Sequence, residues 1–76
     1  MTNPNDRPKV CSEVTKFLRA NTDDKEIKLR RGRGYFYFLH GKADFFGEQG
    51  VYGVGRVSEF TFAGWLAEYQ DRARLV

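Results

Sequence analysis

The apolar residues near the N-terminus repeat with the period of an α-helix. Four of them fall at i, i+4, i+7 and i+8 and form one stripe: Val10, Val14, Phe17 and Leu18. Asp6 can cap a helix at this point, and Pro8 is tolerated in a first turn. The polar run 21–24 ends the pattern, because its side chains compete for backbone hydrogen bonds. We therefore expect a helix that begins near Pro8 and stops at residues 21–24.

The middle of the chain changes to a period of two. Residues 27–31 alternate apolar and basic side chains, which is typical of a half-buried strand. Residues 32–34, Gly-Arg-Gly, can supply the positive φ angles of a hairpin turn. The run 35–39, Tyr-Phe-Tyr-Phe-Leu, has high β propensity and is apolar on both faces, so it indicates a central strand. After a break at 40–44, a third strand is expected over residues 51–57.

The last apolar stripe is again helical. Its residues fall at i, i+3, i+4 and i+7: Phe62, Trp65, Leu66 and Tyr69. The order α-β-β-β-α with short strand connections predicts an α+β fold, in which both helices cover one face of a three-stranded antiparallel meander. The polar residues 1–7 are expected to form a flexible tail, and residues 8–76 a single domain.

Length and charge leave the assembly state and the class of partner open. A chain of 76 residues fits one domain, and such a domain buries only roughly 60% of its unfolded surface. Aromatic residues make up 16% of the chain and raise the apolar area that each buried side chain contributes. A monomer is therefore feasible, and a homodimer is the alternative because small domains often need such help. The formal net charge of +3 is mild, so its distribution matters more than its total.

The cysteine count and the N-terminal residues indicate the cellular compartment. Cys11 is the only cysteine, so no internal disulfide and no cysteine-based zinc site can form. Residues 1–9 lack the apolar core of a signal peptide, and no apolar run reaches the ~20 residues of a membrane span. We expect a cytoplasmic protein that binds no metal, no cofactor and no membrane.

The densest cluster of charge precedes the central strand. Five of the 13 basic residues fall within positions 25–33, against one acidic residue: Lys25, Lys28, Arg30, Arg31 and Arg33. The cluster runs into Tyr35 and Tyr37, and basic side chains beside aromatic ones can attract phosphate and stack bases. A second interpretation is a solvated strand edge, where lysine and arginine prevent edge-to-edge aggregation. A third is a protein interface, since arginine and tyrosine are favoured there.

Phe45 and Phe46 form a second candidate contact. Both lie in a segment flanked by glycines, and two adjacent aromatic side chains are hard to bury together in so small a domain. Exposed, they would anchor a partner in the manner of an interface hot spot. Folded back, they would form a lid over the core.

The residues that could carry catalysis lack the partners that catalysis needs. His40 is the only histidine, and Asp44 is close in sequence but lies in an expected loop with no second catalytic signal beside it. Cys11 lies beside the first apolar stripe, where a cysteine acts as a small buried side chain. The glycine segments contain neither a P-loop lysine–serine pair nor a G-x-G-x-x-G motif that opens a helix. We therefore expect no catalytic residue and no enzymatic activity.

The element order resembles that of the double-stranded-RNA-binding fold and of the HicA-type toxins, which are small RNA-cleaving proteins built on it. The run 13–18 looks like the first helix of those toxins, and 34–38 sits where they place a Gly-Ser-His segment with a catalytic histidine. This chain has Gly-Tyr-Phe at 34–36, so the cleaving activity does not carry over. The Lys-Lys-x-Ala-Lys signature of double-stranded-RNA binders is also absent, since residues 61–65 read Thr-Phe-Ala-Gly-Trp.

A second resemblance covers about residues 27–70. The segments 31–38, 51–52 and 60–62, followed by Trp65 and Leu66, are similar to a group of short uncharacterised reading frames from phages and mobile elements. The resemblance implies an accessory role, in which a small protein binds and modulates host or defence machinery. It assigns no role to any single residue.

These observations favour a non-enzymatic protein that binds another macromolecule, with a protein as the favoured partner. The expected contacts are the basic and aromatic side chains described above: Lys28, Arg30, Arg31, Arg33, Tyr35, Tyr37, Phe45 and Phe46. The alternative is an RNA- or DNA-binding module, in which the basic strand 25–33 contacts phosphate and the adjacent tyrosines stack on bases.

Overall fold

The computed structural model describes residues 3–46 and 50–74, with the backbone alone at Phe46. Its elements follow one another in this order: α1 (Cys11–Asn21), β1 (Lys28–Arg31), β2 (Tyr35–Leu39), α2 (Ala43–Phe46), β3 (Gly50–Tyr52), the 3-10 helix η1 (Val57–Glu59) and α3 (Phe62–Ala73). The long helices α1 and α3 flank the strands, which confirms the α+β prediction. The short α2 and η1 were not predicted, since the sequence indicated a loop and the end of a strand at these places.

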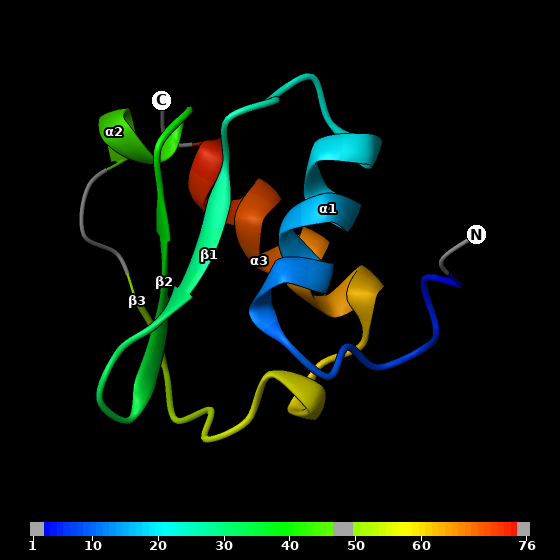
Figure 1. The fold of residues 1–76 in the computed structure, drawn as a ribbon. Helices are drawn as coiled ribbons and strands as arrows, with labels where there is room; N and C mark the ends of the chain where they lie inside the picture. Colours follow the sequence, from blue (N-terminus) through cyan, green and yellow to red (C-terminus); the bar gives the residue numbers. More distant parts are fainter. Residues whose placement is uncertain (1–2, 47–49, 75–76) are drawn as a thin grey trace.

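The strands form one antiparallel sheet in the order β1-β2-β3, with β2 in the centre. Leu29 of β1 lies opposite Phe38, and Phe36 lies opposite Val51 of β3. Figure 1 shows α1 and α3 together on one face of this sheet. The predicted meander with both helices on the same face is therefore confirmed.

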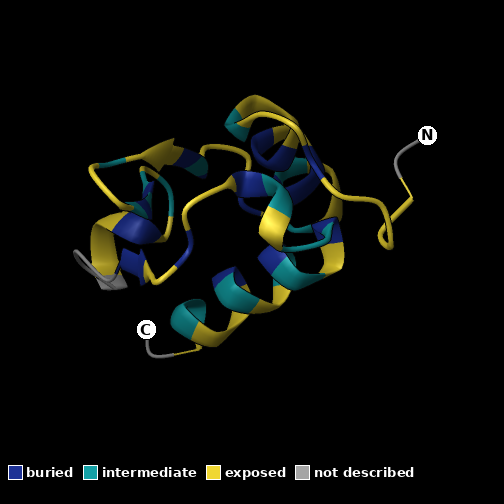
Figure 2. Ribbon diagram, turned by 90° about the horizontal axis from the view of Figure 1, so that it is seen from below, coloured by how far each residue is buried: buried dark blue, intermediate teal, exposed yellow. Residues whose placement is uncertain are grey.

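The core lies between the sheet and the two long helices. The side chains of β2 alternate between the two faces of the sheet. Phe36 and Phe38 are 1% and 5% exposed, whereas Tyr35 and Tyr37, which alternate with them, are only half-buried. Trp65 of α3 is fully buried and meets the Phe36 ring edge-on, with the ring centroids 5.3 Å apart. The remaining core is drawn largely from the predicted stripes and strands: Val14, Leu18, Ile27, Leu29, Val51 and Tyr69. Figure 2 shows the buried residues gathered in the interior, with exposed ones around them.

α1 begins at Cys11 rather than near Pro8, so the predicted start of this helix was wrong. Its first turn is held by Glu13, whose carboxylate accepts hydrogen bonds from the N–H of Val10 at 3.3 Å and of the preceding residue at 2.9 Å. A negative charge at this end is also favourable, because the first N–H groups of a helix carry partial positive charge. The predicted end is confirmed, since α1 stops at Asn21.

Residues 3–7, which belong to the segment expected to be a flexible tail, lie against the start of α3. The carbonyl oxygens of Pro4 and Asp6 accept hydrogen bonds of 2.9 Å from the first two N–H groups of α3. Arg7 donates to two carbonyl groups of η1, also at 2.9 Å. The first N–H groups of a helix lack hydrogen-bond acceptors within the helix, and this segment provides acceptors for two of them. Asp6 therefore accepts a hydrogen bond from α3 through its backbone and does not cap α1.

β3 ends at Tyr52, well before the predicted end at Val57. Gly53 has a φ of +79° and turns the chain out of the sheet, a conformation that glycine adopts without steric cost. Val54 and Val57 are still buried in the core beyond this turn. The predicted third strand therefore ends too late, because Val54 lies in a loop and Val57 in a 3-10 helix.

Candidate functional site

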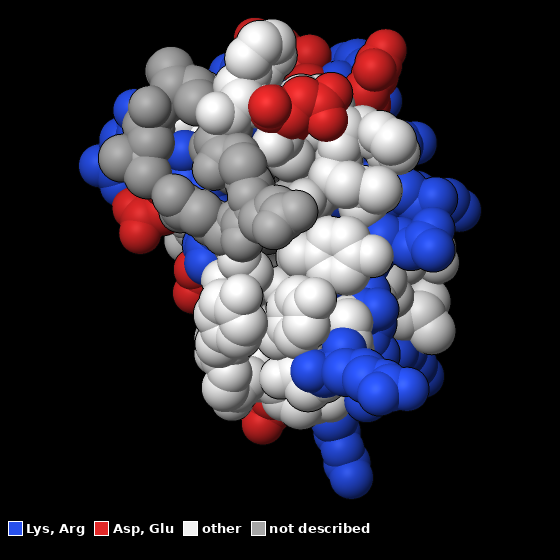
Figure 3. All heavy atoms as spheres, turned by 90° about the vertical axis from the view of Figure 1, so that its left-hand side faces the viewer, with Lys and Arg blue, Asp and Glu red and all other residues white. Residues whose placement is uncertain are grey.

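The face of the sheet that α1 and α3 do not cover, which we call the open face, carries four of the eight predicted contact residues. The strand period of two places these side chains on it: Lys28, Arg30, Tyr35, Tyr37, Leu39 and Tyr52. Arg30 is exposed, Tyr52 is 70% exposed, and the others are partly exposed. In Figure 3 this face is turned toward the viewer, and uncharged rings lie beside a column of basic side chains.

Three tyrosines form a continuous aromatic surface on the open face, and we call them the tyrosine cluster: Tyr35, Tyr37 and Tyr52. The rings of Tyr35 and Tyr52 are stacked, with centroids 5.3 Å apart and planes at 26°. The rings of Tyr35 and Tyr37 lie 5.9 Å apart. Within the described residues, none of the three hydroxyl groups has a hydrogen-bond partner. Sequence reasoning missed Tyr52, although its place next to the buried Val51 in an alternating strand was a usable signal.

Two glycines lie beneath the tyrosine cluster. A Cβ atom on Gly32 would lie 2.5 Å from Cζ of Tyr35, and one on Gly50 would lie 3.0 Å from Cζ of Tyr52 and 3.1 Å from Cδ2 of Tyr35. The first approach is closer than atoms tolerate, and the second is tight. The rings of Tyr35 and Tyr52 therefore rest on one side over bare backbone.

A hollow of about 620 Å³ opens on the same face, along β2. The tyrosine cluster, Leu39 and Asp44 contribute to its lining. Polar and apolar groups both line this hollow. Asp44, at the α2 end, is the acidic side chain among the described lining residues.

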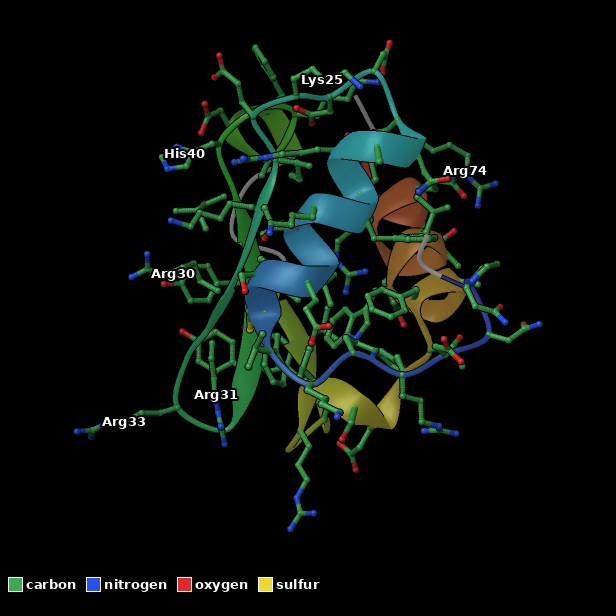
Figure 4. All side chains as sticks on the ribbon, turned by 45° about the vertical axis from the view of Figure 1, so that its right-hand side comes forward. Lys25, Arg30, Arg31, Arg33, His40 and Arg74 are labelled. Carbon is green, nitrogen blue, oxygen red and sulfur yellow. The ribbon has the colours of Figure 1, made fainter. Side chains whose placement is uncertain are left out.

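Three basic residues border the tyrosine cluster, and we call them the basic row: Lys28 and Arg30 on β1 and Arg33 in the β1–β2 turn. Arg30 lies directly opposite Tyr37 in the sheet register. Figure 4 shows Arg30 and Arg33 projecting away from the helices. None of the three forms an ion pair within residues 3–46 and 50–74, whereas Lys42, which lies elsewhere, pairs with an aspartate.

Arg31 and Phe45 lie apart from the open face. Arg31 turns toward the helix side of the sheet, where it donates to the Gly55 carbonyl at 3.3 Å and lies 5.9 Å from the Phe36 ring centroid. Phe45 is 78% exposed on α2, beside a second hollow with Asp23 and other acidic residues in its lining. The side chain of Phe46 lies outside the described part of the structure, so its predicted contact is neither supported nor opposed.

The candidate catalytic residues stand apart from one another. His40 is exposed in a turn with a φ of 65°, and its ring forms no hydrogen bond with the described residues. Burial raises the pKa of the partly exposed Cys11 thiol, and the positive charges of Arg31 and Arg30 oppose that rise. In the described part of the chain, no group of three or more His, Cys, Asp and Glu residues is placed to hold a metal ion.

Both outer edges of the sheet already have side-chain partners. Thr15 of α1 accepts a hydrogen bond from the Leu29 N–H at 3.0 Å, and Arg19 donates to the Ile27 carbonyl at 2.9 Å. On the other side, Arg72 of α3 donates to the first carbonyl of β3 at 3.1 Å. Side chains of both long helices thus cover part of each sheet edge.

A buried carboxylate holds the turn next to the open face, and the sequence did not indicate it. Asp24 is 7% exposed and accepts hydrogen bonds from the Tyr69 hydroxyl at 2.7 Å and the Lys42 N–H at 2.9 Å. Burial acts to raise the pKa of Asp24, but these hydrogen bonds and two further backbone ones outweigh it, so its pKa lies below the usual value. Burial and the bond to Asp24 raise the pKa of Tyr69. Gly41 is needed beside this group, because a Cβ atom there would overlap the carboxylate.

Comparison with known proteins finds no matching family model, no similar curated protein and no similar solved structure. The resemblances in element order and in short segments are therefore expectations from the sequence alone. Among the described residues, no helix combines the length and the apolar character needed to cross a lipid bilayer.

Proposed function

We propose that this protein is a non-enzymatic binding protein that docks a macromolecular partner on its open face. The observation that carries the proposal is the tyrosine cluster, whose rings contact one another, are up to 70% exposed and lie on a surface that neither long helix covers. Tyrosine supplies a large contact area with only two side-chain torsions to order, which makes it a frequent binding hot spot.

The glycines beneath the rings add to the argument. Binding costs free energy when mobile side chains must be ordered. Because Gly32 and Gly50 let the rings of Tyr35 and Tyr52 rest on the backbone, these rings already have neighbours on one face in the free protein. A partner therefore meets a surface that is largely organised before contact.

Composition and charge support different partner classes. The abundance of tyrosine and arginine favours a protein partner, as expected from the sequence. The basic row favours a nucleic acid as the partner, since its three cations form no ion pair within the described structure. In either case, the role that fits is that of a cytoplasmic accessory protein of a phage or mobile element, which modulates a larger machinery by binding it.

The test is affinity capture from a cell lysate with the purified protein and with a Tyr35→Ala, Tyr52→Ala double variant. We expect the wild-type protein to retain a partner that the double variant loses, because the variant removes two exposed rings and leaves the core residues intact. Phe45→Ala is the matched control, since it removes an exposed aromatic ring outside the open face. Equal capture by wild-type and double-variant protein would show that the open face is not the binding surface.

A further inference from the structure

We infer that the partner on the open face is a single-stranded nucleic acid, with its bases stacked on the tyrosine cluster and its phosphates along the basic row. This inference rests on the proposed function, because it requires that the open face binds a macromolecule. It adds the chemical class of that partner.

Charge is the first argument. The ion pairs among the described residues join Lys42 to Asp23, Arg72 to Glu68 and Arg74 to Asp71, all outside the open face. The basic row contributes three further cations that no acidic side chain in the described structure neutralises. Unpaired cations side by side repel one another and attract a polyanion, so their complement is a chain that carries regularly spaced negative charge.

The arrangement of rings and cations is the second argument. Lys28 and Arg30 are two residues apart on one strand, which separates them by about 7 Å along β1, and Arg33 continues the row at the turn. The sheet register places Arg30 directly opposite Tyr37. The cations on β1 and in the turn thus lie beside the rings of Tyr37 and Tyr35 on β2, and Tyr52 adjoins Tyr35 on β3. A nucleic acid strand likewise carries phosphates on one side and bases on the other.

Exposed ring faces distinguish a single strand from a duplex. Stacking on an aromatic side chain requires a base whose face is accessible, and bases in a duplex are covered by their neighbours. The tyrosine cluster lies on the face of the sheet that neither long helix covers, so part of its ring surface is accessible to an unpaired base. Every base has a face that can stack, so we expect little dependence on sequence.

The acidic side chains limit where the strand lies. Asp44 lies at the α2 end of the molecule, where the residues around Phe45 are of mixed charge: Asp23, Glu26, Lys25 and Lys42. Figure 3 shows acidic atoms at that end of the face and basic ones along the rest of one side. The charge pattern therefore directs the strand over the β1–β2 end, where Arg33 and Tyr35 lie, and away from α2.

The experiment measures fluorescence anisotropy of a labelled 12-nucleotide oligo(U) and oligo(dT), titrated with the protein from about 50 to 200 mM salt. With three phosphate contacts, the slope of log affinity against log salt is expected to be about −2, since each contact on a single strand contributes roughly −0.7. Tyr35→Ala and Tyr52→Ala should each weaken binding roughly 5- to 150-fold. Arg30→Ala should reduce the magnitude of the slope by roughly 0.7.

Two controls make the result specific to the open face. Lys16→Ala removes the same charge from the exposed side of α1, and Phe45→Ala removes an exposed ring outside the tyrosine cluster; both should leave affinity within roughly twofold. Circular dichroism and thermal unfolding of each variant show that it is folded. A 12-base-pair duplex should bind more weakly than the single strands.

Several outcomes would overturn the inference. The first is the absence of oligonucleotide binding at the lowest salt, and the second is equal weakening by Lys16→Ala and Arg30→Ala. Duplex binding as tight as single-strand binding would exclude stacking on the tyrosines. If oligonucleotides fail to bind while the lysate yields a nuclease-resistant partner that depends on Tyr35 and Tyr52, the partner is a protein and the proposed function stands without this inference.

Discussion

At the scale of single residues, Asp24 has the largest structural role among the polar side chains. It joins the loop before β1 to the turn after β2, through the Lys42 N–H, and to α3, through the Tyr69 hydroxyl. A buried carboxylate is tolerated only where hydrogen bonds replace its hydration. Asp24 meets this condition, so it fixes the position of three segments instead of destabilising the core.

Replacing Asp24 with alanine should lower the free energy of unfolding by about 2–3 kcal/mol, because the Tyr69 hydroxyl and the Lys42 N–H would lose their acceptor. Urea denaturation at neutral pH measures this change. Asp23→Ala is the control, since the Asp23 side chain is 89% exposed, and a change below ~0.5 kcal/mol is expected. Equal effects of the two substitutions would contradict the assigned role of Asp24.

The same contribution should depend on pH. Because the pKa of Asp24 is lower in the folded protein than its ordinary value near 3.8, its stabilisation is complete above that value and disappears as the pH falls through the folded-state pKa. The stability difference between wild type and Asp24→Ala should therefore shrink below about pH 4. A difference that stays constant down to pH 2.5 in urea denaturation would show that the folded protein does not favour the ionised form.

At the scale of elements, β2 carries aromatic side chains on both faces of the sheet, but the helices cover only one of these faces. Phe36 and Phe38 point into the core, and the tyrosines that alternate with them form the open face. α1 and α3 cover one face, and side chains from both helices occupy the sheet edges. Stabilisation thus comes from one side of the sheet, which leaves the other side available for binding.

Gly32→Ala tests whether the glycines position the tyrosine cluster. The added Cβ atom would overlap the Tyr35 ring, so this ring must move, and the near-ultraviolet circular dichroism of the tyrosines should change. Gly55→Ala is the matched control, since no other atom lies within 4 Å of its Cβ position. Binding through the open face should weaken in the first variant and not in the second. Identical spectra of Gly32→Ala and wild type would show that the ring does not depend on Gly32.

At the scale of the whole molecule, the chain is a two-layer domain whose N-terminal segment supports its last helix. Pro4, Asp6 and Arg7 contact α3 and η1, more than fifty residues away in the sequence. A small domain buries little surface, so a few such long-range hydrogen bonds make up a substantial part of its net stability.

Deleting residues 1–7 should therefore lower the midpoint of thermal unfolding. A loss of about 1–2 kcal/mol corresponds to roughly 4–16 °C for a domain of this size. Arg7→Ala isolates the contribution of the contacts to η1 and should produce a smaller decrease. An unchanged midpoint after the deletion would show that this segment contributes nothing to the stability of α3.

Local patterns in the sequence were sufficient for the elements and for part of the site. The stripes that include Phe17 and Trp65 predicted both long helices, and the high β propensity of residues 35–39 predicted the central strand. The alternation in residues 27–31 predicted that Arg30 lies on the polar side of its strand. These features depend on neighbours a few residues apart, and the periods of helix and strand determine which side each residue faces.

The sequence by itself determined the two long helices, the first two strands and the apolar side of each helix, because these follow from local periodicity and propensity. Only the tertiary structure decided that Tyr52 joins Tyr35, that Arg31 turns toward Gly55, and that Asp24 meets Tyr69. Each of these contacts joins segments that are distant in the chain or depends on a glycine that leaves room for a ring. Such contacts arise when the layers assemble, since packing brings together side chains that no local pattern relates.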